Sequence, residues 1–223
     1  MEYRHEWKHE ITASDLAVLR RRLSVVMEPD GHGEKGRYLV RSLYFDSPTD
    51  RVLRQKLDGV DRREKFRIRY YDRDPSLIRL EKKSKRGGLG WKQTAPLGPE
   101  EARSIASGRP DRLAPCRDSL VWELCSKMCT QLLRPRTIVD YTREAYLYGP
   151  GGVRVTLDYD IRTGLRCTDF LDPDCVTVPA GDAPAILEVK WDAFLPDIVR
   201  DAVQLEGRRT AAFSKYAACR IYG

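Results

Sequence analysis

The chain has 223 residues, enough for one large domain or two small ones, and 33% of them are charged. Its formal net charge of +7 favours an anionic partner such as nucleic acid, anionic lipid or polyphosphate. The sequence has no run of about 18 apolar residues, which argues against a transmembrane helix. Residues 1–10 are highly charged and contain no apolar signal region, so we expect a cytoplasmic protein that does not itself insert into a membrane.

Cysteine and histidine are too sparse and too scattered to form a recognisable motif. No Cys-x-x-Cys pair occurs, so a zinc site is not expected, and we expect the six cysteines to be free, reduced thiols. Three histidines leave no convincing Ser-His-Asp or Cys-His set. Neither a Walker-type loop nor a dinucleotide-binding glycine motif is present.

In the first half of the chain, hydrophobic periodicity predicts mostly strands. Strict alternation over 2–11 predicts a strand, and Ser14 is expected to cap a helix that runs to about residue 27. A glycine-rich loop then leads to further strands and one short helix. We expect strands at 37–46, 63–71, 77–85 and 89–95, and the helix at 47–57.

In the second half, helices precede a group of strands. Helices are predicted at 99–107 and 119–132, followed by strands at 136–147, 153–160 and 185–191. The segment 169–182 is rich in Pro and Asp and is expected to be a loop. Two helices should close the chain, at 197–206 and 213–220.

These elements predict an α+β fold. Most neighbouring strands are joined by short connections, which favours an antiparallel sheet. Strands with one polar and one apolar face suit a closed or nearly closed barrel, with a charged lumen and helices packed outside. We expect one domain over 1–223, because nothing in the sequence looks like an interdomain linker.

The charged residues of the strands occupy one alternating face. A strand has a side-chain period of two, so Arg63, Lys65, Arg67 and Arg69 point to one side and mostly apolar groups to the other. If such faces converge, they form a basic cavity with a few carboxylates, suited to a polyanion and a metal. The same arrangement recurs in Arg4, Glu6 and Lys8; in Arg79, Glu81, Lys83 and Lys85; in Arg154, Thr156 and Asp158; and in Glu188 and Lys190.

Arg67 and Arg69 are the first candidate ligands for phosphate. They share one strand face, and arginine presents a planar, permanently charged fork that matches phosphate oxygens. The alternative is an edge strand whose charges prevent aggregation, and for this strand alone the two readings have equal weight. Lys92 and Lys215 are by default solvated lysines, and Arg143 and Arg154 lie on consecutive predicted strands.

Three Glu-x-Lys pairs place an acid beside a base on one strand face. They are Glu6-x-Lys8, Glu81-x-Lys83 and Glu188-x-Lys190. In a phosphate site the carboxylate can hold a divalent metal while the lysine holds phosphate, although cross-strand ion pairing on a wet surface is the plain alternative. Glu188 is the best metal candidate, because its strand is expected to be otherwise buried and a lone buried carboxylate would be costly.

In chain order, eight motifs of this chain resemble those of one family. The motifs are Arg4-x-Glu6-x-Lys8, Ser42-Leu-Tyr-Phe-Asp-Ser47, Glu64-Lys-Phe-Arg-Ile-Arg-Tyr70, Leu80-Glu-Lys-Lys83, Arg143-Glu-Ala-Tyr146, Val153-Arg-Val-Thr-Leu-Asp158, Leu187-Glu-Val-Lys190 and Phe213-Ser-Lys-Tyr216. Together they resemble the VTC domain, the polyphosphate polymerase domain of the vacuolar transporter chaperone complex and of its bacterial relatives. That family belongs to the triphosphate tunnel metalloenzymes, and the resemblance covers about residues 2–220.

The resemblance implies an antiparallel tunnel of about eight strands and an ATP-dependent polyphosphate polymerase. Such an enzyme transfers the ATP γ-phosphate to a growing inorganic polyphosphate chain, with Mn2+ or Mg2+ as cofactor. By motif, the resemblance implies Glu188 as the metal ligand. Glu6, the acid of another Glu-x-Lys pair, is expected to be a second metal ligand. The implied catalytic set is Arg67, Arg69, Lys83, Glu188 and Lys190, and the implied phosphate-binding set adds Lys8, Lys92, Arg143, Arg154 and Lys215.

The expected ligands are therefore ATP and inorganic polyphosphate, but other functions stay open at this point. A triphosphate or tripolyphosphate hydrolase would use the same residues with water as the attacking group. A non-catalytic polyphosphate- or nucleotide-binding module is also compatible, and it could serve a membrane or cell-envelope partner protein. Nucleic-acid binding is disfavoured, because the acids on the same strand faces would repel a duplex backbone.

Overall fold

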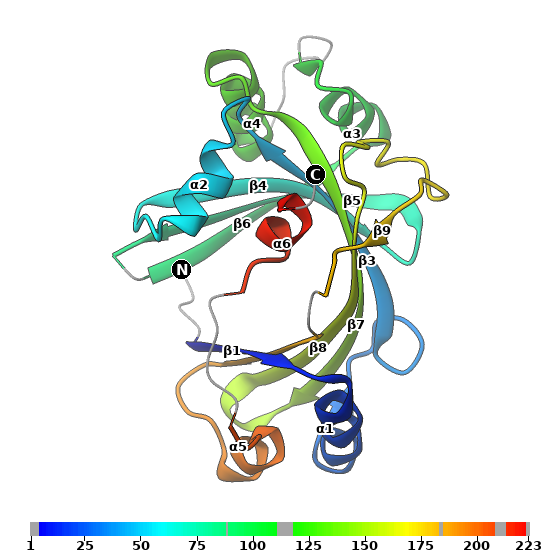
Figure 1. The fold of residues 1–223 in the computed structure, drawn as a ribbon, viewed down its shortest axis with the longest axis vertical. Coiled ribbons are helices and arrows are strands. Elements are labelled where there is room, and N and C mark those ends of the chain that lie inside the picture. The colour runs from blue at the N-terminus through cyan, green and yellow to red at the C-terminus, as the bar shows by residue number, and fades with distance from the viewer. Residues whose placement is uncertain (1–4, 88, 111–117, 183–184, 208–212, 222–223) are drawn as a thin grey trace.

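The computed structural model describes residues 5–87, 89–110, 118–182, 185–207 and 213–221. Its main feature is one antiparallel sheet that curls into a half-barrel (Figure 1). Residues 2–4, expected in the first strand, lie outside the described residues, as does Cys116. Along the sheet the strands follow the order β1 (His5–Ile11), β10 (Ala185–Trp191), β8 (Val153–Thr163), β7 (Arg134–Tyr148), β3 (Arg37–Asp46), β4 (Arg63–Tyr71), β5 (Asp74–Arg86) and β6 (Leu89–Leu97).

The sheet ends at β1 on one side and at β6 on the other. Two short strands lie off this path: β2 (Glu28–Pro29) pairs with β7, and β9 (Val178–Pro179) pairs with β8. The predicted α+β class, the antiparallel pairing and the eight-stranded path are confirmed. The barrel is open rather than closed, because within the described residues β1 and β6 are the two free ends of the hydrogen-bonded order.

The strands predicted from the cleanest alternation have the expected bounds. Residues 37–46, 63–71 and 185–191 form β3, β4 and β10 without correction. By contrast, β8 extends three residues beyond its predicted end at Asp160. The register between β7 and β8 shifts there, and Asp160 has a left-handed φ of 50°. Such a bulge inserts one residue and resets the alternation, so a strict period of two ends too early.

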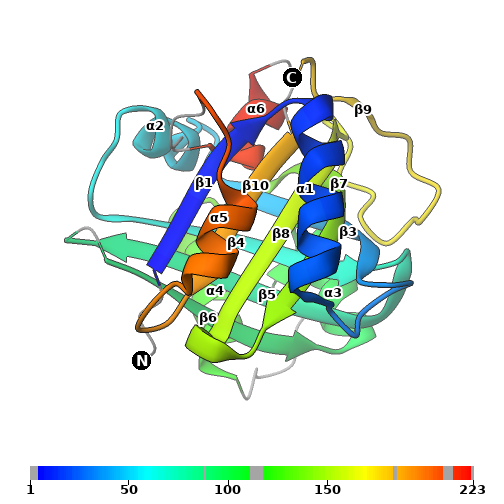
Figure 2. The same ribbon diagram turned by 90° about the horizontal axis from the view of Figure 1, so that it is seen from below.

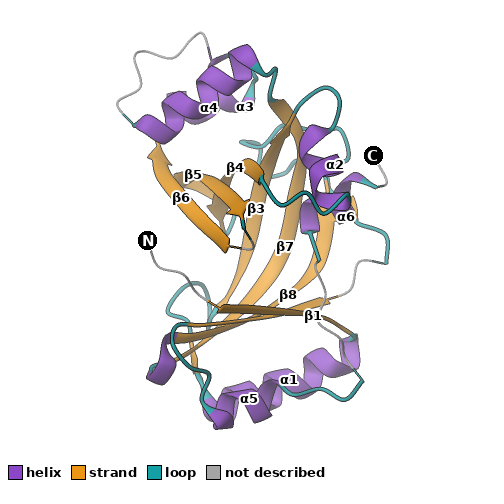
Figure 3. Ribbon diagram, turned by 90° about the vertical axis from the view of Figure 1, so that its left-hand side faces the viewer, coloured by secondary structure: helices purple, strands orange, loops and turns teal. Residues whose placement is uncertain are grey.

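Helices cover the outer face of the sheet in two groups, seen at opposite ends of Figure 3. α1 (Ala13–Val26) and α5 (Asp197–Val203) lie side by side across β8 and β10 (Figure 2). α3 (Pro99–Ala106) and α4 (Ser119–Thr130) pack on the other half, over β5 and β6. Leu19 and Leu23 of α1 have no exposed surface, and burying each contributes roughly 1.5–3 kcal/mol. None of the helices described is long and apolar enough to cross a membrane.

The predicted cap of α1 is wrong by two residues. Thr12, not Ser14, is the N-cap: its Oγ1 accepts from the Asp15 backbone N–H at 3.2 Å. The Asp15 carboxylate in turn accepts from the Thr12 N–H at 2.9 Å, which completes a capping box. The start of the helix is therefore set by the reciprocal pair, and Ser14 lies within its first turn.

Two short helices close one end of the half-barrel, with Asp46 at their centre. α2 (Arg51–Leu57) follows β3, and α6 (Lys215–Arg220) lies between the two halves of the sheet in Figure 1. The buried Asp46 carboxylate accepts from the Val52 N–H at 2.8 Å, the Leu53 N–H at 3.0 Å and the Tyr216 hydroxyl at 2.7 Å. This carboxylate ties both helices to the end of β3. A 3-10 turn, η2 (Pro150–Gly152), joins β7 to β8.

Candidate functional site

The face of the sheet opposite α1, α3, α4 and α5, here called the concave face, carries the charged residues. On β8 and β10 the outer residues Val155, Leu157, Leu187 and Val189 pack against α1 and α5. Their alternating neighbours must therefore point to the concave face. These neighbours are Arg154, Thr156, Asp158, Glu188 and Lys190.

Glu188 is the central carboxylate of the first half of this face. Its Oε1 lies 3.2 Å from Lys8 Nζ and 3.3 Å from Lys190 Nζ, and its Oε2 lies 3.8 Å from Arg143 Nη2. The side chain is only 8% exposed. Burial alone would favour the neutral acid, but Lys190 and the neighbouring cations outweigh it and hold the pKa of Glu188 well below its usual range. Glu188 is therefore a charged, desolvated carboxylate.

Glu6 lies beside Glu188 and shares its lysines. Its carboxylate is 2.7 Å from Lys8 Nζ and 3.5 Å from Lys190 Nζ. The ladder between β1 and β10 explains this arrangement, because Lys8 pairs with Glu188 while Glu6 pairs with Lys190. Burial lowers the pKa of Lys8, but Glu188 and Glu6 outweigh this effect and raise it overall. Acid and base alternate in both directions across the two strands.

Asp158 forms a second buried anchor on β8. Its carboxylate accepts from Arg143 Nε at 2.6 Å, from Arg143 Nη2 at 2.8 Å and from Lys215 Nζ at 2.6 Å. Burial opposes the charged form of Asp158, but Arg143 and Lys215 prevail and lower its pKa to about 2. Lys215 begins α6, so Asp158 also holds that helix over the concave face.

Arg154 and Thr156 retain unused hydrogen-bonding groups. Arg154 Nη2 donates to Asp30 Oδ2 at 2.7 Å and to the Tyr38 hydroxyl at 3.0 Å. Among the described residues, the buried Nε of Arg154 and the buried Oγ1 of Thr156 have no hydrogen-bond partner. Thr156 pairs directly with Glu188 in the ladder, whereas Arg154 pairs with Lys190. Buried polar groups are normally satisfied, so the Thr156 hydroxyl is available for a further contact beside Glu188.

The second half of the concave face is built around Glu81 of β5. Arg67 Nε donates to Glu81 Oε2 at 2.7 Å and Lys92 Nζ to Oε1 at 3.0 Å, while Arg69 Nη1 lies 3.7 Å away. Burial favours the neutral acid, but Arg67 and Arg69 outweigh it and lower the pKa of Glu81 far below its usual value. Lys65 and Lys83 lie on the same half of the face as Glu81 and its three cationic partners.

Tyrosines and a serine orient the two arginines. Arg67 Nη1 donates to the Tyr44 hydroxyl at 2.7 Å, and Arg69 donates to Ser42 Oγ at 2.9 Å and to the Tyr141 hydroxyl at 3.0 Å. Burial raises the pKa of the Tyr44 phenol, but Arg67 and Lys65 outweigh it and lower this pKa to about 8. The guanidinium groups are thus held in fixed positions before any ligand binds.

Lys65 and Lys83 have no carboxylate partner in the part of the chain that the structure describes. Burial and the neighbouring cations lower the pKa of Lys65 to about 8. Burial likewise lowers the pKa of Lys83. The positive charges of Lys190 on β10 and Lys8 on β1 lower it further. Because those strands belong to the other half of the sheet, the two halves face each other across the concave space.

All of the predicted site residues lie on the concave face, but they do not form one cluster. One group surrounds the carboxylates of the first half: Glu6, Lys8, Arg143, Glu188, Lys190 and Lys215. A second group surrounds Glu81: Arg67, Arg69 and Lys92. Lys83 lies between the groups, and Arg154 lies to one side with Asp30.

The sequence analysis missed several residues of this face. Asp158 and Lys65 were recognised on alternating strand faces but were not included among the site residues. Tyr44, Tyr141 and Asp30 carried no signal of a role, because their contacts are to Arg67, Arg69 and Arg154, each more than 20 residues away. Only the parity of Tyr141 with Arg143 could have indicated that it shares the concave face.

The donor set around Glu188 is compatible with a small divalent cation that is shared with phosphate. Glu188 and Glu6 are near enough to contact the same lysines, and the unsatisfied Thr156 hydroxyl lies opposite Glu188. Within the described residues, no group of three His, Cys, Asp or Glu side chains could hold a metal alone. Mg2+ commonly takes one or two carboxylates, with phosphate and water completing the octahedron.

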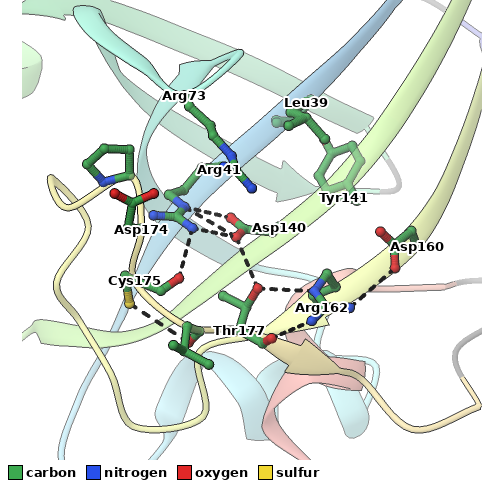
Figure 4. Close-up of a pocket in the computed structure, with 13 residues that line it drawn as sticks. Leu39, Arg41, Arg73, Asp140, Tyr141, Asp160, Arg162, Asp174, Cys175 and Thr177 are labelled. Carbon is green, nitrogen blue, oxygen red and sulfur yellow. Dashed lines mark hydrogen bonds and ion pairs between the residues drawn. The ribbon is translucent and has the colours of Figure 1, made fainter.

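A separate cavity of about 430 Å3 lies beside the loop 172–177 (Figure 4). It is organised by Arg41, whose guanidinium contacts Asp140 at 2.9–3.2 Å and the Asp172 carbonyl at 2.5 Å. Arg41 and Asp140 neutralise each other, and Arg162 is bound to Thr177. These contacts fasten the loop to the sheet, so we assign the cavity no part in the candidate site.

Solved structures that share this fold include the following two. The PH1012 protein from Pyrococcus horikoshii OT3 aligns with a TM-score of 0.51 at 11% identity, over 99% of each chain. A Bacillus halodurans protein described as a "putative adenylate cyclase" aligns with a TM-score of 0.51 at 14% identity, over 90% of this chain and 86% of its own. At such identities the likeness is one of fold alone.

Sequence comparison is more specific. No curated protein sequence matches this chain. The sequence profile of the VTC domain, however, matches residues 3–221, which is nearly its full length. The same segment contains every strand motif on which the resemblance was based. This chain therefore belongs to the VTC domain family.

Proposed function

We propose that this protein is an ATP-dependent polyphosphate polymerase. It would transfer the γ-phosphate of ATP to the end of an inorganic polyphosphate chain on the concave face, in the presence of Mn2+ or Mg2+. Family membership and the tunnel-like fold support the broader statement that the chain handles polyphosphate or triphosphate. The observation that carries the proposal is the pair of facing cation clusters, each built around a buried carboxylate.

In this proposal the Glu81 half binds and orients the triphosphate. Arg67 and Arg69 would redirect donors toward phosphate oxygens, since arginine binds them in a two-pronged geometry. Their positions are already fixed by Tyr44, Ser42 and Tyr141. Fixed donors stabilise charge that develops during transfer without reorganising at that moment.

The unpaired lysines reduce the repulsion between two anionic reactants. Lys83 and Lys65 are kept only weakly basic by burial and by their cationic neighbours. A bound phosphate would favour their charged forms, so each would hold a proton more firmly when substrate is present. The attacking group is itself a phosphate chain end, already ionised, so this reaction needs no strong general base.

Glu188 is assigned as the main metal ligand, with Glu6 as its neighbour. Lys8, Lys190 and Arg143 would move from these carboxylates to phosphate oxygens when a metal is held there. A bound Mn2+ or Mg2+ would spread the charge on the transferred phosphoryl group. Thr156 would contribute its unsatisfied hydroxyl to the same ligand set.

The test is to incubate the purified protein with ATP and Mn2+ and to resolve the products by gel electrophoresis and phosphorus NMR. A ladder of long phosphate chains together with ADP is expected. Free phosphate without chains would instead identify a triphosphate hydrolase. Polyphosphate binding without ATP consumption would identify a non-catalytic binding module and would contradict the polymerase.

A further inference from the structure

Cations face one another in two successive rows where β4 begins and β5 ends. Lys65 pairs with Lys83 in the ladder, and in the next row outward Arg63 pairs with Lys85. Like charges directly opposite on neighbouring strands are destabilising. Nothing in the described chain provides a carboxylate partner for Lys65, Lys83 or Lys85. A bound anion would stabilise two such rows.

Arg63 and Lys85, together with the neighbouring Arg62 and Arg86, are here called the rim. Their positive charge continues to the outside of the sheet. A cavity of about 550 Å3 lies there, between α2, α4 and the ends of β4 and β5, and Arg62, Arg63, Lys85 and Arg86 line it. The cations of the rim are therefore accessible to anions in solution.

The carboxylates of the same cavity are already neutralised. Glu123 lies 2.6 Å from Lys82 and 2.7 Å from Lys127, and Glu64 contacts the same two lysines. Five cations on the cavity wall have no carboxylate partner that the structure describes: Arg51, Arg62, Arg63, Lys85 and Arg86. The excess positive charge thus belongs to the rim rather than to the ion-pair network beside it.

Lys56 of α2 links the rim to the candidate site electrostatically. Burial lowers the pKa of Lys56, and the positive charges of Arg63, Lys8 and Lys85 lower it further. Lys8 belongs to the Glu188 group, whereas Arg63 and Lys85 belong to the rim. Lys56 is therefore close enough to interact electrostatically with cations of both groups.

We propose that this rim is an exit track for polyphosphate: a chain too long for the concave face leaves across Lys85 and Arg63 and continues past Arg62 and Arg86. The inference rests on the proposed function, because it assigns a direction to the product of that reaction. Same-face residues of a strand are about 7 Å apart, so a flexible chain of phosphates can contact successive rows. A tripolyphosphate held on the concave face would leave the outer cations free.

The test compares the affinities of two ligands, tripolyphosphate and a long polyphosphate, by calorimetry at fixed ionic strength. The double variant Lys85→Gln/Arg86→Gln should weaken binding of the long chain by about tenfold, the size expected from losing charge-assisted contacts. Its affinity for tripolyphosphate should change by less than about twofold. The matched control is Arg21→Gln/Arg166→Gln, which removes two exposed cations elsewhere and should leave both affinities unchanged.

The outcomes separate this inference from the proposed function. If the rim variant binds the long chain as tightly as the wild type, while Arg69→Ala weakens both ligands, the exit track is wrong and the site stands. An equal loss of affinity in the control variant would show that net charge alone causes the effect, and it would also overturn the exit track. Length-selective loss without conversion of ATP would keep the rim as a binding surface for polyphosphate, but it would contradict the polymerase and with it the exit of a product. A wild type that binds neither ligand overturns both.

Discussion

Lys65 on β4 and Lys83 on β5 lie directly opposite each other, and the described structure gives neither a carboxylate partner. Burial contributes most to lowering both pKa values, and neighbouring cations lower them further. Such a pair is unfavourable in the empty protein and becomes favourable when a polyanion lies between the ammonium groups. The two lysines therefore couple ligand binding to protonation.

The first prediction concerns that coupling. The pKa of Lys65 is about 8 in the folded protein, against an ordinary value of 10.5. At pH 8.5 much of Lys65 is neutral, and a bound polyanion should restore its proton. Calorimetry of tripolyphosphate binding in buffers of different ionisation enthalpy should therefore show less proton uptake for Lys65→Met than for the wild type. The proton balance of the ligand is common to both proteins, so the difference reports Lys65.

Lys35→Met, which replaces an exposed lysine in a loop, should leave the proton uptake unchanged. Equal proton uptake by Lys65→Met and wild type would contradict the assignment.

The lowered pKa of Lys65 also has a consequence for stability. Between about pH 8 and 10.5 the unfolded chain binds more protons at Lys65 than the folded chain does, so this residue's contribution to stability rises with pH.

Arg69→Ala is expected to reduce turnover by about 100-fold or more, the scale of losing one preorganised charge stabiliser. Arg69 is almost fully buried and is fixed by Ser42 and Tyr141, so no neighbour can replace it. Arg79→Ala is the matched control, because Arg79 lies opposite Arg69 in the ladder but is exposed. An unchanged rate in folded Arg69→Ala protein would remove Arg69 from the site.

Glu188→Gln should weaken binding of Mn2+ by about tenfold or more in the presence of tripolyphosphate, as measured by electron paramagnetic resonance. Glu6→Gln should have a smaller effect, because Glu6 is 35% exposed and Glu188 only 8%. The comparison is informative because both variants remove one negative charge beside the same lysines. Equal losses would make the two carboxylates equivalent ligands, and no loss in either would contradict the metal assignment.

Tyr216→Phe is expected to lower the free energy of unfolding by about 1–2 kcal/mol in urea titrations. The change leaves one lone pair of the buried Asp46 carboxylate without its 2.7 Å hydrogen bond. Tyr148→Phe is the control, since this half-buried tyrosine has no side-chain hydrogen bond in the structure. Because Tyr216 follows Lys215 in α6, turnover should fall as well. A stability unchanged from the wild type would show that Asp46 does not need the phenol.

Sequence patterns identified the elements and the face on which the site lies. Alternation over 63–71 and 185–191 gave both the bounds of β4 and β10 and the direction of Arg67, Arg69 and Glu188. It failed at Asp160, where a bulge changes the parity, and at the first helix, where the cap depends on a reciprocal bond between Thr12 and Asp15. A periodic pattern reports regular geometry, and both errors arise where the geometry is irregular.

The sequence by itself determined which side chains share a face, because strand parity is a property of neighbouring residues. Only the tertiary structure decided which acid pairs with which base. Glu81 accepts hydrogen bonds from Arg67 and Lys92, whereas Asp158 accepts them from Arg143 and Lys215. It also decided that the sheet stays open between β1 and β6, and that Lys65 and Lys83 are left without acids. These features depend on strand register and on the curl of the sheet, which are set by packing between segments far apart in the chain.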